Sequence, residues 1–460
     1  MALGIYIQVP FCQTKCTYCN FRTGVVARDR YEPYVGAVCR EIELSEPGSM
    51  LRLSPSAQHA SHPESAAADK GSQRDRSLGL PTVPDLRNAV VDTVYFGGGT
   101  PSLLDPAALA RILDALHHVF HFVRPSDERP PSATCHSACP EPSERESRTG
   151  TDRVEESAFA SPEVTLEADP ETITPDKAAA WLAAGFDRIS LGAQSFNDAE
   201  LRAAGRMHRR DDIFTAVHTL RAAGFDNISM DLIAGLPHQT RATWEESVSE
   251  LFNLGPEHIS IYMLEIDEGS RLGTESLAGG VRYGAQAIPP DDAVADFYES
   301  ACARLAAAGY DHYEISNWAC PRGQALPSRR SRHNLKYWRR EPYVGFGAGA
   351  HSFDGTRRWA NVHDAAQYVA CIERGISPRE QIEEVTPAQA LEEELFLGLR
   401  QLDGIDLARL EREYNGSTAA LSDRISALRS QGLVELSGTR IRLAPDRLAV
   451  SNEVFVELLR

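Results

Sequence analysis

The feature that most constrains the fold is an internal repeat in which a helix ends at glycine and leads into a strand. Residues 183–190 (AAGFDRIS) recur at 222–229 as AAGFDNIS, and residues 307–313 (AAGYDHY) form a looser copy. Glycine favours the left-handed conformation that ends many helices. Apolar residues recur at helical spacing between the strands. Repeated β-α-β units predict a parallel sheet, most simply a full or partial α/β barrel.

Further strands extend this pattern toward the N-terminus. They are predicted at residues 3–9, 90–96 and 163–169. Two stretches lack periodicity and are rich in Ser, Pro and charged residues, at about 47–84 and 124–161. Such composition is typical of surface insertions rather than of a packed core. We therefore predict that residues 1–360 form one barrel domain that carries two insertions.

The C-terminal part of the chain has a different pattern. Residues 361–385 are predicted to be a linker, and residues 386–460 a separate small domain. Within that domain the predicted order is three helices, two short strands and a last helix, which favours a winged-helix-like α+β fold. Because the chain is acidic, we interpret this domain as a lid or a partner surface rather than as a DNA reader.

Three of the nine cysteines lie close together as Cys12, Cys16 and Cys19, in C-x3-C-x2-C spacing. Cysteine sulfur suits iron–sulfur clusters and zinc, and structural zinc sites usually draw four ligands from two separated pairs. Three thiolates in one loop favour a [4Fe–4S] cluster with one open iron, and zinc is the alternative. Cys135 and Cys139 lie in the second insertion, whose composition argues against a metal site there.

The charge and the cysteine content exclude several classes of protein. The 460-residue chain has a formal net charge of -18, which argues against a nucleic-acid-binding surface. Nine cysteines are too few for a disulfide scaffold in a chain of this length. The N-terminus lacks the features of a signal peptide, and no stretch approaches the roughly 20 apolar residues that span a bilayer. We expect a cytoplasmic protein.

Taken together, these motifs resemble the radical S-adenosylmethionine (SAM) superfamily. The resemblance rests on the cysteine loop, on Tyr18 before its last cysteine, and on the sequence GGGTP that begins at Gly97. It implies a partial (β/α)6 TIM-like barrel in which the open iron of a [4Fe–4S] cluster binds SAM. Within the superfamily the chain is similar to the oxygen-independent coproporphyrinogen III oxidase group, apart from the two insertions.

The resemblance also implies which residues bind SAM. They are Tyr6, Tyr18, Gly98, Gly99, Thr100, Glu167, Gln194, Arg206, Asp231 and Glu265. Bare backbone at the glycines allows a ligand to approach closely, and Arg206 suits a carboxylate. Each residue also has a structural interpretation: strand-end carboxylates cap loops, Gln194 can satisfy backbone groups, and Tyr6 can pack in the core. Their common position at one edge of successive βα units favours a SAM site.

Two departures separate the chain from the oxidases and point to their heme chaperone branch. Phe21 stands where the oxidases have a fourth cysteine, and only eleven residues precede Cys12. His333, Asn334, Tyr337 and Trp338 match the HNxxYW signature of the relatives regarded as heme chaperones. A neutral imidazole is a common ligand of heme iron. The alternative is that His333 is a satisfied core histidine and the aromatic residues are packing.

Further candidates lie near this signature. His351, in GAHS, is a second candidate ligand of heme iron. The densest basic cluster of the chain surrounds the signature and could face heme propionates or a membrane surface. It consists of Arg329, Arg330, Arg332, Lys336, Arg339 and Arg340.

The expected function is that of a heme chaperone that binds the cluster, SAM and heme and transfers heme to acceptor proteins. The enzyme alternative is radical oxidative decarboxylation of coproporphyrinogen III, an oxidoreductase reaction of porphyrin biosynthesis. A radical SAM methylase or other modifying enzyme is a third class. We expect heme-acceptor proteins and an electron donor as partners, no nucleic acid, and a monomer or a homodimer.

Overall fold

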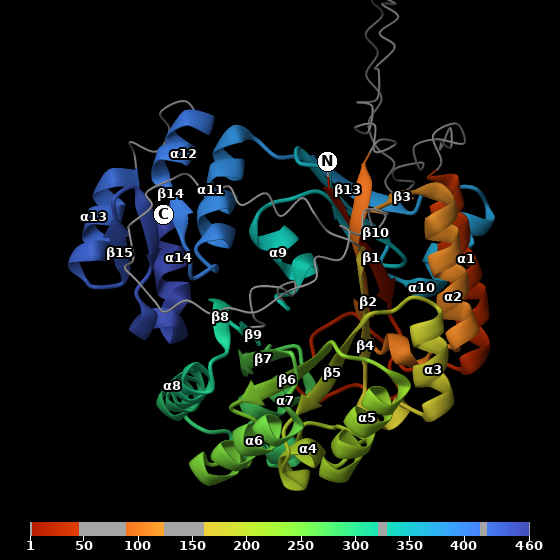
Figure 1. Cartoon of the computed structure of the whole chain (residues 1–460), viewed down its shortest axis with the longest axis horizontal. Coiled ribbons are helices and arrows are strands. Elements are labelled where there is room, and N and C mark those ends of the chain that lie inside the picture. The colour runs from red at the N-terminus through yellow and green to blue at the C-terminus, as the bar shows by residue number, and fades with distance from the viewer. Residues whose placement is uncertain (1, 46–88, 124–160, 321–328, 415–420, 460) are drawn as a thin grey trace, which may run out of the picture.

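The computed structural model describes residues 2–45, 89–123, 161–320, 329–414 and 421–459. The predicted insertions, with Cys135 and Cys139, lie outside these residues except for Ser161. Figure 1 shows a curved sheet with helices on its outer side and a separate small domain built from the C-terminal residues. No helix in the described ranges combines the length and the apolar character that crossing a membrane requires.

The centre of the large sheet consists of parallel strands in chain order, as the repeat predicts. They are β1 (Ala2–Val9), β2 (Val90–Gly98), β4 (Glu163–Ala168), β5 (Arg188–Gln194), β6 (Ile228–Ala234) and β7 (His258–Met263). Apolar side chains that alternate along these strands face a common core; Ile5, Val94 and Leu166 are fully buried. The strands curve as a partial (β/α)6 barrel, so the predicted fold class is confirmed.

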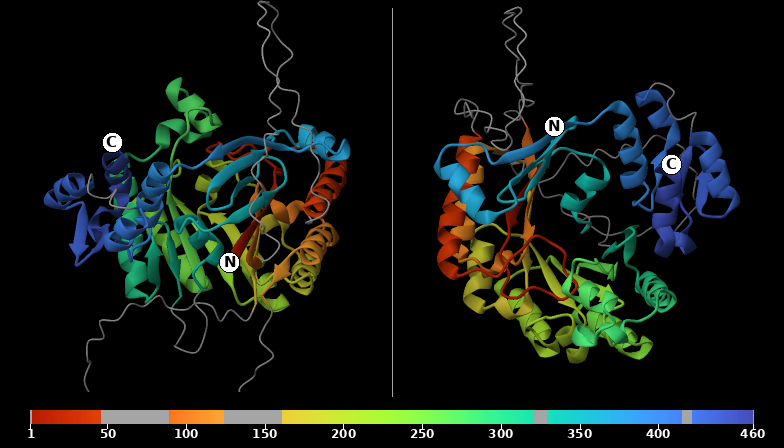
Figure 2. Two further views of the ribbon diagram at one scale, coloured as in Figure 1. Left: turned by 90° about the horizontal axis from the view of Figure 1, so that it is seen from above. Right: turned by 180° about the vertical axis from the view of Figure 1, so that it is seen from behind.

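Helices cover the outer face of the parallel strands (Figure 1). They are α1 (Tyr31–Leu44), α2 (Pro106–Val119), α3 (Pro175–Ala183), α4 (Asp198–Ala203), α5 (Arg210–Ala223), α6 (Arg241–Leu254) and α8 (Asp291–Ala307). Between β7 and α8, the short helices α7 (Arg271–Leu277) and η5 (Arg282–Ala287) project from the body of the protein, as the left panel of Figure 2 shows. The short strand β3 (His121–Phe122) pairs with β2.

The three copies of the repeat end as the sequence predicts. Gly185, Gly224 and Gly309 have φ angles of 101°, 108° and 83°. The first two copies lead into the parallel strands β5 and β6. The third leads into β8 (Asp311–Glu314), which turns back at once into β9 (Asn317–Ala319), antiparallel to β7. Without a following helix no further parallel unit forms, and the barrel ends at this edge.

The other edge of the sheet continues past β1. Strand β10 (Tyr343–Phe346) is parallel to β1, and β11 (His351–Phe353), β12 (Arg357–Asn361) and β13 (Arg379–Glu384) follow as antiparallel neighbours. Residues 361–385, which the sequence pattern assigns to a linker, therefore contain helix α10 (Ala365–Glu373) and β13. The Tyr368 hydroxyl of α10 donates to Glu41 at 2.6 Å, which fixes this helix against α1.

The C-terminal domain has its own sheet, in the order β14-β16-β15. Its elements are α11 (Pro387–Gly398), β14 (Ile405–Asp406), α12 (Leu407–Glu413), α13 (Ser422–Ser430), β15 (Val434–Ser437), β16 (Arg440–Leu443) and α14 (Ser451–Leu459). This arrangement is winged-helix-like, as predicted. Helix α9 (Arg332–Trp338) lies between this domain and the barrel strands in both Figure 1 and the right panel of Figure 2.

Two exposed glycines provide a test of the repeat. At Gly185 and at Gly36 of α1 an added Cβ would meet open space, but only Gly185 has a left-handed φ. We expect Gly185→Ala to destabilise the protein by about 1–2 kcal/mol. Gly36→Ala, inside a helix, should stabilise it by about 0.5–1 kcal/mol. Thermal unfolding of the two variants and the wild type measures the difference. Equal shifts of the unfolding midpoint in the two variants would show that the left-handed φ of Gly185 does not contribute to stability.

Candidate functional site

The cysteine loop follows β1 and is closed by backbone hydrogen bonds. The Cys12 N–H donates to the Gly24 carbonyl at 3.0 Å, and the Gly24 N–H donates to the Pro10 carbonyl at 2.9 Å. The loop therefore begins and ends at one point, above the carboxyl end of the first barrel strand.

Thr17, in the middle of the cysteine loop, ties it to the segment after α4. Its N–H donates to the Ala204 carbonyl at 2.9 Å, and its hydroxyl donates to the Ala203 carbonyl, also at 2.9 Å. The Leu272 N–H, from α7, donates to the Thr17 carbonyl at 2.8 Å. Since these bonds come from two other segments, the cysteines are presented on a supported loop rather than on a free one.

All three cysteines of the loop are unpaired and partly buried. Burial raises the pKa of Cys12 and of Cys19, and neighbouring loop cysteines act in the same direction. In the described ranges no three Cys, His, Asp or Glu side chains are grouped as ligands of a single metal ion. Three thiols on one loop fit an iron–sulfur cluster, where each cysteine binds a different iron. The donor set is therefore compatible with the predicted cluster.

The glycine strip at the end of β2 packs against the start of this loop. The Gly99 N–H donates to the Val9 carbonyl at 2.8 Å, and the Thr100 N–H donates to the Phe11 carbonyl at 2.7 Å. A Cβ on Gly99 would lie 2.4 Å from the Phe11 carbonyl oxygen. Gly98 has a φ of 109°. The chain must therefore approach the backbone of these glycines closely. At Gly99 the approaching group is the Phe11 carbonyl, at the start of the cysteine loop.

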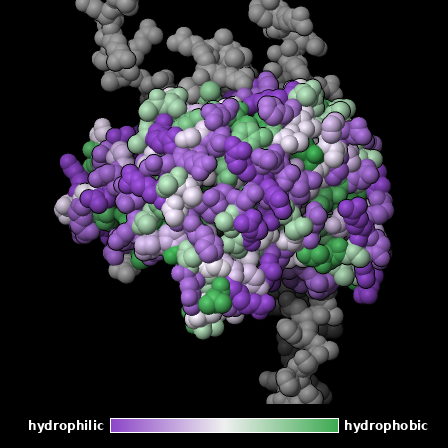
Figure 3. Space-filling model, turned by 90° about the horizontal axis from the view of Figure 1, so that it is seen from below, coloured by the Kyte–Doolittle hydropathy of each residue, from purple (hydrophilic) through white to green (hydrophobic). Residues whose placement is uncertain are grey.

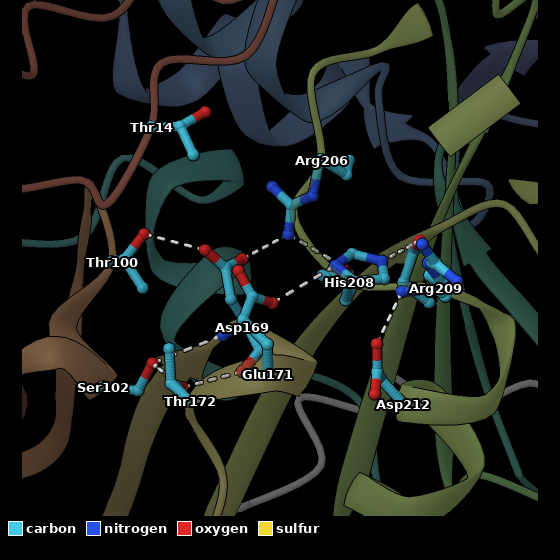
Figure 4. Close-up of polar contacts among 12 residues, drawn as sticks. Thr14, Thr100, Ser102, Asp169, Glu171, Thr172, Arg206, His208, Arg209 and Asp212 are labelled. Atoms are coloured by element: carbon cyan, nitrogen blue, oxygen red, sulfur yellow. Dashed lines mark hydrogen bonds and ion pairs between the residues drawn. The ribbon is translucent and has the colours of Figure 1, made fainter. Parts of the chain in front are cut away.

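Arg206 lies at the centre of a buried polar cluster (Figure 4). Its guanidinium forms an ion pair with Asp169 and donates to the Gly192 carbonyl at 3.0 Å. A third contact, 3.4 Å long, runs from Arg206 Nη1 to the Cys16 sulfur. The Thr100 hydroxyl donates to Asp169 at 2.9 Å. Two predicted SAM residues, Thr100 and Arg206, therefore meet through Asp169.

Asp169 is a functional candidate that the sequence reasoning missed. It stands two residues after Glu167 in the same LEADP motif, so its position at a strand end was the available signal. Gln194 joins the same cluster: a Cβ on Gly192 would lie 3.0 Å from Gln194 Nε2 and 3.1 Å from Arg206 Nη2. Gln194 has a φ of 67°, a strained conformation that often marks functional sites.

A second layer supports this cluster. His208 places Nε2 3.1 Å from the Ala193 carbonyl oxygen and Nδ1 3.3 Å from a Glu171 carboxylate oxygen. Figure 4 shows His208 and Glu171 beside Arg206 and Asp169. Because His208 is buried, these contacts hold the segment that carries Arg206.

Two more predicted residues line the interior of the barrel below the loop. Glu167 accepts from the Tyr95 hydroxyl at 3.0 Å and from the Gly98 N–H at 3.1 Å. Burial raises the pKa of Glu167 to about 7, and the nearby Asp231 also raises it, against these hydrogen bonds. Burial likewise raises the pKa of Asp231 to about 6. Asp231 Oδ1 has no hydrogen-bond partner among the residues described, which is costly for a buried carboxylate.

The other predicted SAM residues differ in their surroundings. The ring of Tyr6 stacks on the ring of Tyr95 inside the barrel, with ring centroids 6.0 Å apart. Tyr18 packs against a small apolar cluster that includes Ile233 and Leu236. Glu265 lies exposed beyond the end of β7, so the structure does not bring it into the barrel.

Helix α9 carries the HNxxYW signature, and its histidine is buried inside the barrel. His333 Nδ1 lies 2.9 Å from the Thr93 hydroxyl, and Nε2 lies 3.0 Å from the Tyr337 hydroxyl. Burial lowers the pKa of His333 to about 3, with the charge of Lys336 acting in the same direction. Both ring nitrogens are engaged, so His333 matches the satisfied core histidine that the sequence left as the alternative.

The remaining signature residues lie on different sides of α9. Tyr337 faces Tyr343, with ring centroids 4.7 Å apart. The guanidinium carbon of Arg400 lies 4.4 Å from the ring centroid of Trp338, on the side of the C-terminal domain. Asn334 is partly buried in the first turn, and its N–H donates to the Ser331 hydroxyl at 3.3 Å. The four residues therefore do not face one common ligand.

The basic cluster around α9 is largely neutralised by carboxylates. The pairs are Arg329–Asp226 at 3.0 Å, Arg330–Asp311 at 2.8 Å, Arg332–Glu163 at 4.0 Å, Lys336–Asp92 at 2.8 Å and Arg340–Glu393 at 2.7 Å. At least five of its six cations thus have acidic partners, and the cluster does not form the open positive surface that the sequence suggested. The face of the protein in Figure 3 is mostly hydrophilic, with small separate apolar patches.

A cavity of about 680 Å³ joins the cysteine loop to the barrel interior. Its lining includes Tyr6, Gly98 and Glu167 from the predicted SAM site and Tyr337 from the signature. Residues 20–22 of the cysteine loop form one side of it. His351 and His363 also line it, and His363 is a second residue that the sequence reasoning missed. The volume is within the range of small-molecule sites, roughly 300–1,000 Å³.

The fold and the cysteine loop define a radical SAM protein. The Radical SAM superfamily matches residues 82–251, and the HemN C-terminal domain family matches residues 385–446. The superfamily binds a [4Fe–4S] cluster and SAM. The structure of coproporphyrinogen III oxidase (HemN) from Escherichia coli is similar, with a TM-score of 0.70 over 99% of this chain and 89% of that chain. At 19% identity, this likeness shows a shared fold.

Similarity along the whole sequence identifies the family. The heme chaperone HemW of Mycobacterium tuberculosis (strain ATCC 25618 / H37Rv) is 32% identical over 446 residues, which cover 96% of this chain and 90% of that protein. The heme chaperone HemW of Bacillus subtilis (strain 168) is 29% identical over 451 residues, 98% and 97% of the two chains. The chain belongs to the heme chaperone HemW family.

The buried Arg206–Asp169 pair provides a test of the polar cluster. We expect Asp169→Asn to cost about 3–5 kcal/mol of unfolding free energy, because it leaves a buried guanidinium unpaired. Adding Arg206→Met should recover part of this loss, so the two costs are non-additive by about 1–3 kcal/mol. Urea unfolding of the wild type, the Asp169→Asn and Arg206→Met variants and the double variant measures the coupling. The exposed pair Arg241–Glu245 is the control, with a coupling below about 1 kcal/mol. Additive costs at Asp169 and Arg206 would contradict the pairing.

The buried state of His333 predicts a pH effect. In the unfolded chain its pKa is near the ordinary value of about 6.5, whereas burial lowers the pKa in the folded protein to about 3. The stability that neutral His333 contributes is complete above pH 6.5 and is lost as the pH falls toward 3, by about 1.4 kcal/mol per unit. His333→Gln lacks this titration.

The stability difference between wild type and His333→Gln should therefore narrow on acidification from pH 7 to pH 5. Unfolding free energies at pH 7, 6 and 5 measure it, and titrations of other groups cancel in the difference. Parallel curves for the two proteins would contradict the burial of His333.

Proposed function

We propose that this protein is a heme chaperone that holds its cluster at Cys12, Cys16 and Cys19 and passes heme to acceptor proteins. The observation that carries the proposal is membership in the heme chaperone HemW family along nearly the whole chain. The shared cavity supports it, because the same space borders the cysteine loop, the predicted SAM residues and the signature helix. Heme is the cargo in this proposal.

The cluster and SAM belong at the mouth of the barrel. The three thiols would hold the cluster, with one ligand for each of three irons, and the fourth iron would remain open for SAM. Gly98, Glu167 and Tyr6 line the cavity beside the loop and can contact a SAM molecule there. The Arg206 guanidinium contacts Asp169, the Gly192 carbonyl and the Cys16 sulfur, so its proposed role is to support the cysteine loop rather than to bind the SAM carboxylate.

Phe21 favours cargo binding over decarboxylase chemistry. It replaces the fourth cysteine of the oxidase pattern, and its side chain lines the cavity with 67% of its surface exposed. A phenyl ring neither ionises nor donates a hydrogen bond. It offers apolar contact to a flat macrocycle. The following experiment distinguishes this function from the enzyme alternative, the oxidation of coproporphyrinogen III.

The test uses the full chain, reconstituted anaerobically with iron and sulfide. We expect hemin to bind with a defined absorption spectrum and to move to a heme-free globin added as the acceptor. Incubation with SAM, a reductant and coproporphyrinogen III should give no product above the cluster-free control. Rapid conversion of coproporphyrinogen III, or a failure to bind hemin, would overturn the chaperone proposal.

The cluster ligands have their own test. Cys16→Ala should lose the brown visible absorption and most of the bound iron and sulfide, because a cubane held by two cysteines is unstable. Cys371→Ala, in α10 and outside the loop, is the matched control and should keep both. Iron and sulfide analysis with visible spectroscopy measures the outcome. A full cluster complement in Cys16→Ala would refute its assignment as a ligand.

A further inference from the structure

Two histidines line the cavity together with residues of the cysteine loop. His351 begins β11, and His363 follows β12, so the antiparallel pairing of these strands brings them together. Their ring centroids are 6.4 Å apart. His351 is exposed and His363 is partly buried, and both line the cavity.

Local backbone structure holds this pair in place. The Gly349 N–H donates to the Val362 carbonyl and the Asn361 N–H donates to the Ala350 carbonyl, each at 2.9 Å. Gly349 has a φ of 71°, and a Cβ there would lie 2.9 Å from His363 Nδ1. Glycine is therefore needed at this position to make room for the imidazole. The histidines are part of a built site rather than of a variable loop.

The imidazoles of this pair are available for binding, unlike that of His333. Among the residues described, neither ring nitrogen of His351 or His363 has a hydrogen-bond partner, whereas both nitrogens of His333 are engaged. Burial lowers the pKa of His351, and His363 and Arg358 act in the same direction. Neutral imidazole is the form that binds iron.

The surroundings of the pair suit a flat, apolar molecule with acidic edges. Tyr343 and Tyr337 form an aromatic wall, and the exposed ring of Phe21 also lines the cavity. Arg22 supplies a cation to the same space, and a guanidinium binds carboxylates well. Heme has a flat apolar ring for the aromatic wall and propionate groups for the Arg22 guanidinium. Its iron also needs a ligand, which an imidazole nitrogen supplies.

We propose that heme binds in this cavity with its iron ligated by the His351–His363 pair, and that His333 is not an iron ligand. This inference rests on the proposed heme chaperone function. It moves the site of iron binding from α9 to strands β11 and β12. His333 and Tyr337 then have a supporting role, because their hydrogen bond fixes the wall against which the macrocycle lies.

The experiment titrates hemin into the full chain and records its absorption and EPR spectra. The double variant His351→Ala/His363→Ala should lose the imidazole-ligated spectrum and bind hemin at least tenfold more weakly, and free imidazole should restore the spectrum. His333→Gln should keep the imidazole-ligated form of the spectrum but bind hemin more weakly, because it loses the hydrogen bond that fixes Tyr337 in the cavity wall. His218→Ala, an exposed histidine of α5, is the matched control and should keep the wild-type spectrum. Cluster content and thermal midpoint show that the double variant is folded.

The outcomes separate the two proposals. A double variant with wild-type spectrum and affinity would overturn the ligand assignment and leave the chaperone function standing. A loss of the spectrum in His333→Gln, with retention in the double variant, would return the ligand role to α9. A wild-type protein that does not bind hemin would overturn the proposed function and this inference with it.

Discussion

The structure depends on how the polar interior of the incomplete barrel is satisfied. Buried polar groups are costly unless they are hydrogen-bonded. Helix α9 supplies partners: Glu163 of β4 accepts from the N–H groups of Arg332 and His333, and His333 connects the Thr93 and Tyr337 hydroxyls. A carboxylate at a helix N-terminus is also electrostatically favourable. The barrel and α9 therefore stabilise each other, which accounts for the histidine of the signature without any ligand.

The same helix joins the barrel to the C-terminal domain. Arg340, just after α9, pairs with Glu393 of α11 at 2.7 Å, and Trp338 stacks on Arg400. The Leu402 N–H donates to the Tyr313 carbonyl at 3.1 Å. One continuous apolar core also runs from the barrel into this domain. The winged-helix-like domain is thus attached through α9, the helix that also contributes Tyr337 to the cavity wall.

Local signals predicted much of this protein, and long-range contacts limited the rest. The repeat predicted the parallel strands because left-handed glycines and helical periodicity are local properties, and the cysteine loop is local too. The sequence did not reveal that β13 continues the large sheet within residues 361–385, since its exposed, charged strand lacks alternation. The burial of His333 depends on Thr93, 240 residues away, and the His351–His363 pair depends on strand pairing. Such contacts are set by topology, which a motif alone does not contain.

The exposure of the groups that line the cavity suits the carrying of heme better than the oxidation of a porphyrinogen. A decarboxylase needs a site that shields a radical from water, and here the exposed ring of Phe21 and the exposed His351 border the space. A carrier has the opposite requirement, because an acceptor must reach the iron or the edge of the macrocycle before the heme leaves. An exposed histidine meets this requirement, whereas a ligand buried as deeply as His333 does not. The exposure of His351 therefore agrees with the proposed ligand role, and residues of the cysteine loop line the same cavity.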